Sequence, residues 1–192
     1  NGQFYTDSGR AKFIRISPRK PYESVTETYP LTLNTGRIRD QWHTMTRTGL
    51  SATLAHHTQE PLIEIHPSNA KQYQIKNNHL VNVKSQHGHA IFRAHISNDV
   101  QPNNAFIAIH WTQQTSSSGS VCSLIGEQQD PISGQPQYKA TPIQLTPIPF
   151  TTEAILTTTT ALTLANLPSQ TTLYWVSKKV TAGYQYHINS AL

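Results

Sequence analysis

The chain has 192 residues, 36% of them hydrophobic and 13% charged, and its 15 basic and 10 acidic side chains give a formal net charge of +5. This length suffices for one domain with a proper core and an appendage. The charge favours anionic partners, but lysine and arginine are spread along the sequence, which argues against nucleic acid. No apolar stretch approaches the roughly 20 residues of a membrane span, so we expect no membrane partner.

The chain contains one cysteine, Cys122. A single cysteine excludes a disulfide framework and a multi-cysteine zinc or iron–sulfur site within these residues. It fits a reducing compartment, and we expect a cytoplasmic location. The sequence starts at Asn1 with neither an initiator methionine nor a signal peptide, so we expect it to be part of a longer protein.

Residues 1–28 are expected to form a lead-in arm. Polar and apolar side chains alternate over 12–16, which predicts a strand there. An apolar run then begins at Leu31 and breaks at Asn34-Thr-Gly36. This pattern predicts a strand near 30–34 that ends in a glycine turn.

The glycine turn leads into a segment rich in hydrogen-bond donors. Gly36 would let the backbone approach a ligand without a side chain in the way. Arg37 and Arg39 offer planar forks suited to phosphate, and Trp42 offers a ring face and an N–H group. Such a segment suits an anion that carries a flat ring, and the alternative is a basic, solvated loop.

Short strands are predicted further along the chain, where apolar residues alternate or cluster, at 61–66, 80–85, 90–96, 105–111 and 141–146. Pro67 suits the first position of a short helix over 67–73. A tight turn between the second and third of these strands predicts a hairpin. Many short strands with one short helix indicate a mainly β barrel or sandwich.

The last part of the chain is rich in threonine, alanine and leucine. We expect a linker over 147–170, with a short element near 161–167. Residues 173–177 and 183–188 alternate, which predicts a hairpin within a C-terminal hairpin or tail over 171–192.

The run Thr35-Gly-Arg-Ile-Arg-Asp-Gln-Trp-His-Thr44, followed by Met-Thr-Arg-Thr-Gly49, resembles a known family. It is similar to the C-terminal domain of the bis-molybdopterin guanine dinucleotide oxidoreductases, the DMSO reductase family, and most of all to assimilatory nitrate reductases. Ordered similarities at 64–83, 102–111 and 130–139 extend the resemblance over roughly residues 4–145. Together they are more specific than any single motif.

The resemblance implies a mainly β fold, a six-stranded double-psi β-barrel of the aspartate decarboxylase-like kind, over 29–146, with short helices and a C-terminal extension. It also implies that molybdopterin guanine dinucleotide lies in a cleft lined by Thr35, Gly36, Arg37, Gln41, Trp42, His43, Thr44, Thr46, Tyr138 and Lys139. The molybdenum ligand and an iron–sulfur cluster would belong to other parts of the full-length chain. We therefore expect no catalytic and no metal-binding residue here.

The function implied by the resemblance is that of the cofactor-binding domain of a molybdenum-dependent nitrate reductase, which converts nitrate to nitrite. The expected partners are the remaining domains of the same large subunit and an electron-donor protein or domain. The 192 residues alone are expected to be inactive. One alternative is the same domain of a formate dehydrogenase, and another is a stand-alone basic β-barrel that binds nucleic acid or a protein.

Three positions depart from the family's pattern. Asn78 and Asn103 stand where relatives usually carry glycine in two turns, and asparagine is the next-best residue for positive φ. Cys122 stands where relatives often place an asparagine that contacts the cofactor. A thiol cannot reproduce the paired donor and acceptor of that amide.

Overall fold

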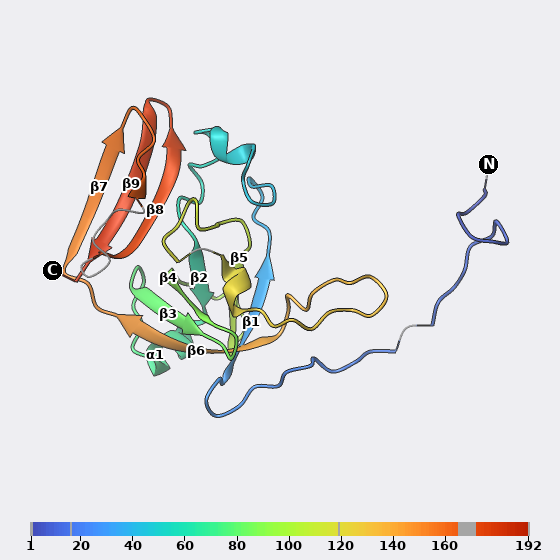
Figure 1. Ribbon diagram of the computed structural model, residues 1–192. Coiled ribbons are helices and arrows are strands. Elements are labelled where there is room, and N and C mark those ends of the chain that lie inside the picture. Colours follow the sequence, from blue (N-terminus) through green and yellow to red (C-terminus); the bar gives the residue numbers. More distant parts are fainter. Residues whose placement is uncertain (1, 16, 119, 165–171, 192) are drawn as a thin grey trace.

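The computed structural model describes residues 2–15, 17–118, 120–164 and 172–191 (Figure 1). Strands dominate these ranges: β1 (Leu31–Gly36), β2 (Leu62–Ile65), β3 (Leu80–Lys84), β4 (His89–Ile96), β5 (Asn104–Ala108), β6 (Thr141–Ile148), β7 (Thr152–Thr158), β8 (Thr172–Val180) and β9 (Gly183–Ser190). The helices are short: α1 (Pro67–Gln72) and the 3-10 helices η1 (Thr48–Leu50) and η2 (Val121–Leu124). None of the helices in these ranges is long and apolar enough to cross a membrane.

The first six strands close into a barrel in the order β1-β5-β2-β4-β3-β6. β1 is parallel to β5 and β2 is parallel to β4, whereas the other neighbours are antiparallel. This closed six-stranded, mainly β architecture fits a double-psi barrel and confirms the expected fold. The predicted hairpin is the antiparallel pair of β3 and β4.

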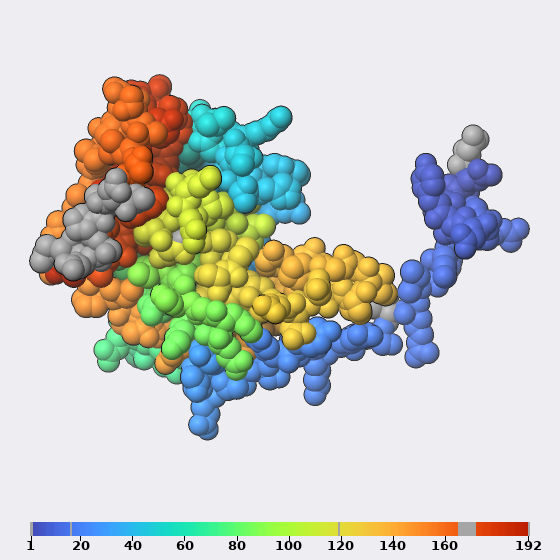
Figure 2. Space-filling model, viewed as in Figure 1, coloured from blue at the N-terminus to red at the C-terminus, as the bar shows by residue number. Residues whose placement is uncertain are grey.

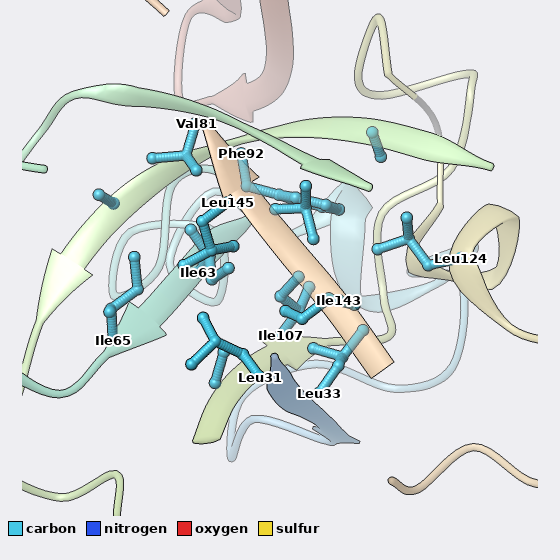
Figure 3. Close-up of a cluster of buried hydrophobic side chains, with 14 of the residues drawn as sticks. Leu31, Leu33, Ile63, Ile65, Val81, Phe92, Ile107, Leu124, Ile143 and Leu145 are labelled. Carbon is cyan, nitrogen blue, oxygen red and sulfur yellow. The ribbon is translucent and has the colours of Figure 1, made fainter. Parts of the chain in front are cut away.

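Alternate residues along each strand point into the barrel, where they form one apolar core (Figure 3). In β1, Leu31, Leu33 and Thr35 are buried, and the residues between them are more exposed. The other strands contribute in the same way, and the labelled core side chains include Ile63, Ile65, Val81, Phe92, Ile107, Ile143 and Leu145.

The two asparagine turns behave as expected for residues that replace glycine. Asn78 has a φ of 67° and Asn103 a φ of 62°. Asn69 of α1 fixes the second turn, since its Oδ1 accepts the N–H of Asn103 at 2.7 Å and its Nδ2 donates to the Asn103 side chain at 3.0 Å. Buried amide contacts thus hold a conformation that most side chains avoid.

The strand predicted at 12–16 is wrong over residues 12–15, and Ile16 lies outside the described residues. Within the described ranges the arm has no neighbouring strand to pair with, and a strand without a partner is not stable. Phe13 and Ile14 are therefore exposed. Figure 2 shows the arm passing beside the projecting loop before β6 and then leaving the body of the protein, and Tyr22 N–H donates to Gln137 Oε1 at 3.2 Å where the two meet.

The linker predicted over 147–170 contains a strand, so that prediction is wrong for β7. β7 pairs with β9 from Thr152 opposite Ser190 to Thr158 opposite Tyr184. Threonine favours strands, but the partner strand lies about thirty residues downstream. Residues 161–164 form no strand, and the rest of the element expected near 161–167 lies outside the described residues.

β8 and β9 form the predicted hairpin and complete a three-stranded sheet in the order β7-β9-β8, the C-terminal sheet (Figure 1). Arg93 of β4 is 5% exposed and joins this sheet to the barrel. Its guanidinium lies 2.9 Å from a Glu60 oxygen and 3.1 Å from Glu153 of β7, and it donates to Asn189 of β9 at 2.8 Å. One buried arginine therefore contacts both the barrel and the C-terminal sheet.

Candidate cofactor-binding site

A cleft of about 500 Å3 opens where β1 and β5 end. These two strands are parallel, with Gly36 opposite Ala108, so their carboxyl ends lie side by side. The loop before β6 forms the other wall. We call this the barrel cleft; its lining includes Thr35, Gly36, Arg37, Ile109 and residues 135–139.

Contacts across the barrel cleft hold its two walls together. The ammonium of Lys139 donates to the carbonyl oxygen of Thr35, and the Thr35 hydroxyl donates to the carbonyl oxygen of Tyr138 at 2.8 Å. Thr35 is 1% exposed, so it shapes the wall without offering a free hydroxyl. An ammonium has three donors, and Lys139 therefore retains donors for an anion.

Glycine at position 36 is needed for packing, in addition to the close approach of a ligand that the sequence predicts. A Cβ built on Gly36 would lie 2.8 Å from Cε2 of Phe106 in β5. Contacts that short do not occur in real side-chain packing, so a residue larger than glycine would have to displace the ring. The absence of a side chain here lets β1 close against β5 at the edge of the cleft.

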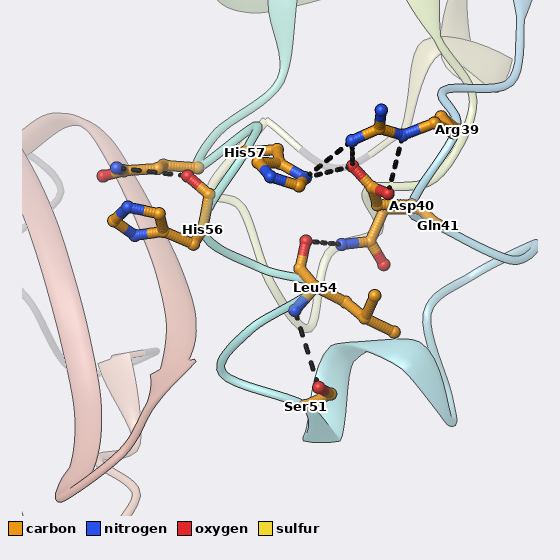
Figure 4. A network of polar contacts seen from close by, with 8 residues as sticks. Arg39, Asp40, Gln41, Ser51, Leu54, His56 and His57 are labelled. Carbon is orange, nitrogen blue, oxygen red and sulfur yellow. Dashed lines mark hydrogen bonds and ion pairs between the residues drawn. The ribbon is translucent and has the colours of Figure 1, made fainter.

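The two arginines of the donor-rich segment differ in what they contact. Arg39 pairs with Asp40, with 3.0 Å between its Nε and Oδ1, and Asp40 also contacts His57 (Figure 4). The hydrogen bond from Arg39, and then that from His57, lower the pKa of Asp40. Over the described residues Arg37 pairs with no carboxylate, and its guanidinium lies 5.7 Å from the centre of the Trp42 ring. Arg37 therefore has its donors available for an anion.

The segment after Arg37 turns outward. Trp42 is 57% exposed and its ring meets that of His43 edge-on, with 4.5 Å between ring centres. His43 and Met45 both have positive φ, 43° and 61°. The indole therefore lies next to Arg37, a residue of the barrel cleft, and the imidazole packs against the indole.

Other predicted site residues line a different cavity. A second hollow of about 630 Å3 lies between residues 41–59 and the C-terminal sheet. Gln41, Thr44 and Thr46 line it, together with aromatic and basic side chains that include Trp111, Trp175, Lys178, Lys179, Tyr184 and Tyr186. The structure thus divides the ten predicted residues between two cavities and the exposed pair Trp42 and His43.

Gln41 has both ends of its amide engaged. It is 5% exposed, and its Nε2 donates to the carbonyl oxygen of Leu54 at 3.2 Å (Figure 4). Its Oε1 accepts from the Thr48 hydroxyl at 2.7 Å. These contacts fold residues 41–54 back on themselves. Gln41 therefore supports the loop in this structure, and its amide is not free for a ligand.

His110 is a residue of the site to which the sequence pattern assigned no role. It follows β5 and is fully buried. Its Nδ1 lies 2.6 Å from the carbonyl oxygen of His43, and its Nε2 accepts the N–H of Ile38 at 3.0 Å. The only signal in the sequence is a histidine at the end of a strand that otherwise consists mainly of apolar residues.

Cys122 lies near the barrel cleft as well. Electrostatic repulsion by Cys122 is the main factor that raises the pKa of the Tyr138 phenol, followed by burial. The thiol is exposed and free. The sequence had linked Cys122 to the cofactor only through the family's pattern, and the structure sets it beside one of the predicted cleft residues.

The barrel cleft suits an anionic ligand with a flat ring. It offers an arginine that pairs with no carboxylate in the part of the chain that the structure describes, a lysine with spare donors, and an exposed indole next to the arginine. Such groups bind phosphate and stack on heterocycles. Over the described residues there is no group of three or more histidine, cysteine, aspartate or glutamate side chains that could hold a metal ion.

Comparison with known families gives a match to residues 31–142, described as "Molydopterin dinucleotide binding domain". These residues include β1 to β5 and the start of β6. All ten predicted site residues lie inside the matched range. The C-terminal sheet lies outside it.

Nitrate reductases and formate dehydrogenases are among the relatives that match this chain. A nitrate reductase from Klebsiella oxytoca is 36% identical over 137 residues, which cover 71% of this chain and 16% of that protein. An F420-dependent formate dehydrogenase subunit alpha from Methanocaldococcus jannaschii is 36% identical over 111 residues, which cover 58% of this chain and 16% of that protein. This chain therefore spans less than a fifth of the length of these relatives.

Among solved structures, acetylene hydratase from Pelobacter acetylenicus has a similar fold, with a TM-score of 0.54 and 16% sequence identity. The likeness covers 62% of this chain and 18% of that chain. At this identity it concerns the fold alone.

Proposed function

This chain belongs to the molydopterin dinucleotide binding domain family, within the DMSO reductase family of molybdenum oxidoreductases, and on this premise we propose that it serves a nitrate reductase, which reduces nitrate to nitrite. Its own part in that enzyme is to bind molybdopterin guanine dinucleotide. The remaining domains of the large subunit, an iron–sulfur cluster and an electron donor complete the proposed enzyme in the cytoplasm. The 192 residues alone are proposed to be inactive.

The observation that carries this proposal is the contrast between Arg37 and Arg39. Both lie in the segment that resembles the family's binding motif, yet only Arg39 is neutralised by a carboxylate. Arg37, which pairs with no carboxylate among the described residues, lies at the mouth of a cleft, and such a cation is suited to a phosphate. We assign Arg37 and Lys139 to the pyrophosphate of the cofactor, and Trp42 and His43 to its pterin ring.

The bound cofactor supplies the molybdenum at which an oxygen atom is transferred. This chain's residues bind and orient the cofactor. Lys139 already bridges the two walls of the barrel cleft, so binding there needs little ordering of the protein. Preorganisation of this kind reduces the entropy lost on binding.

Nitrate is favoured over formate by the run Gln41-Trp-His-Thr-Met-Thr-Arg-Thr48, which is most similar to that of assimilatory nitrate reductases. Overall identity does not separate the two, because both relatives described above are 36% identical. Assay of the full-length enzyme with nitrate and with formate decides between them. Turnover of formate alone would contradict the proposed substrate.

The binding role is tested with GDP, which carries the guanine and pyrophosphate of the cofactor. We expect Arg37→Ala to weaken GDP binding about tenfold or more, since a hydrogen bond to a charged group contributes roughly 1.5–3 kcal/mol. Arg39→Ala is the matched control two residues away and should change the affinity by less than about twofold, because its partner is Asp40. Calorimetric titration of both variants gives the two values.

Equal loss of affinity in the two variants would contradict the assignment of Arg37. Binding of oligonucleotides that weakens steeply with salt, without any binding of GDP, would instead support a basic β-barrel that binds nucleic acid.

A further inference from the structure

His110 connects the end of β5 to both ends of the segment 38–43. Its Nε2 accepts the N–H of Ile38 at 3.0 Å, directly after Arg37, and its Nδ1 donates to the carbonyl oxygen of His43 at 2.6 Å, directly after Trp42. The ring is fully buried, so water does not compete for these contacts. We call this pair of hydrogen bonds the His110 bracket.

The bracket requires one protonation state of His110. A backbone N–H can only donate and a carbonyl oxygen can only accept, so Nε2 must be bare and Nδ1 must carry the proton. A second proton, on Nε2, would face the Ile38 N–H. Burial, the largest cause, lowers the pKa of His110, and the nearby Arg37 and His43 act in the same direction, while the hydrogen bond to His43 opposes them.

The segment held by the bracket ends in an uncommon backbone conformation. His43 has a φ of 43°, and Met45, just beyond it, has a φ of 61°. Side chains with a Cβ seldom adopt this region. The contact of Arg37 with the Trp42 ring spans the same segment. Release of the carbonyl of His43 would therefore let the backbone relax and separate these two side chains.

We propose that His110 is a positioning residue, whose bracket keeps Arg37 and Trp42 together at the barrel cleft so that they can receive one ligand. The inference rests on the proposed function for the identity of that ligand. The effect on Arg37 and Trp42 is a property of the protein alone and can be measured without any ligand.

The ligand-free 192-residue chain provides the first test. Imidazole nitrogen spectra of the wild type should show His110 as the neutral Nδ1–H form down to below pH 6.5, the ordinary value for histidine. His110→Ala should abolish the nuclear Overhauser contact between the Trp42 ring and the Arg37 side chain, and should remove the hydrogen-exchange protection of the Ile38 amide. His110→Gln, which keeps an adjacent donor and acceptor without a titrating group, should restore both.

Two controls separate positioning from loss of stability. His89→Ala changes an exposed histidine on β4 and should alter neither signal. Ile107→Val weakens the core at β5 without touching the bracket, and should lower the urea midpoint while the contact between Trp42 and Arg37 persists. Persistence of that contact in His110→Ala, or its loss in Ile107→Val to the same extent, would overturn the proposal.

GDP titration provides the second test. We expect His110→Ala to weaken GDP binding about five- to tenfold, because Arg37 would lose its position and with it most of one charged hydrogen bond to the ligand. His110→Gln should restore that position and bind GDP with an affinity within about threefold of the wild type. Failure of the wild type to bind GDP would contradict the proposed function but leave the ligand-free result to decide on the bracket. Unchanged GDP affinity in His110→Ala, with the wild type binding, would overturn the positioning role.

Discussion

The barrel cleft and the second hollow are lined in part by the same sequence motif, yet their polar groups are in different states. In the barrel cleft, Arg37 has no carboxylate partner among the described residues. In the second hollow, Lys178 donates to Gln59, and Lys179 lies 4.2 Å from the centre of the Tyr184 ring. A cavity's chemistry thus depends on where the fold places its cations and on what they contact, more than on which donors the sequence contains.

The largest expected effect comes from the arginine that joins the wall of the second hollow to the barrel. Arg93→Ala would leave Glu60, whose side chain is 12% exposed, without its charge partner. We expect the free energy of unfolding to fall by about 3 kcal/mol, the usual cost of breaking a buried ion pair from one side. Urea denaturation gives the value, and Arg47→Ala, at an exposed arginine, should cost less than about 0.5 kcal/mol.

The same variant tests whether the two cavities are independent, because Arg93 contacts the C-terminal sheet but not the barrel cleft. Below its denaturation midpoint, Arg93→Ala should bind GDP within about twofold of the wild type. Adding Glu60→Gln should recover part of the lost stability, since it removes the unpaired charge. A loss of GDP affinity as large as that of Arg37→Ala would mean that the two cavities are not independent.

A smaller effect is expected from two glycines, one in each cavity. Gly36→Ala would bring a Cβ to 2.8 Å from the Phe106 ring, whereas Gly49→Ala would bring one to 3.1 Å from Cβ of Met45. We expect Gly36→Ala to lower the free energy of unfolding by about 1–3 kcal/mol through overpacking. Gly49→Ala should lower it by less than about 1 kcal/mol, because the longer contact requires only a small shift of Met45.

The double variant Gly36→Ala with Phe106→Leu tests the cause assigned to the first glycine. A smaller side chain at 106 should recover part of the loss if the Phe106 ring is the obstacle. Loss of stability that is equal for the two glycines, or that does not respond to the change at 106, would contradict the packing difference between the two cavities.

The barrel was predictable because its strands carry local signals. Alternation in 80–85 and 90–96 gave the hairpin of β3 and β4, and Pro67 gave the start of α1. β7 was missed because its pairing depends on β9, far along the chain, and its own sequence resembles a threonine-rich linker. The prediction of a strand at 12–16 was wrong for the opposite reason. Its local pattern is typical of a strand, but a strand without a partner does not form a sheet.

The residues of the site were predictable from motifs, but the contacts that these residues make after folding were not. The motif led to Arg37 and Lys139, which do meet at one cleft. It could not reveal that Gln41 uses its amide within the loop, because Leu54 and Thr48 reach it only after folding. His110 had no signal of its own, since its partners are two backbone groups about seventy residues upstream.

The most direct test of the account is to determine which cavity GDP perturbs in the 192-residue chain. Chemical-shift mapping during a GDP titration should show saturable changes at Gly36, Trp42 and Lys139, and no comparable changes at Trp175 and Tyr184. Binding that shifts Trp175 and Tyr184 while Gly36 and Lys139 stay unchanged would contradict the assignment of the cofactor to the barrel cleft.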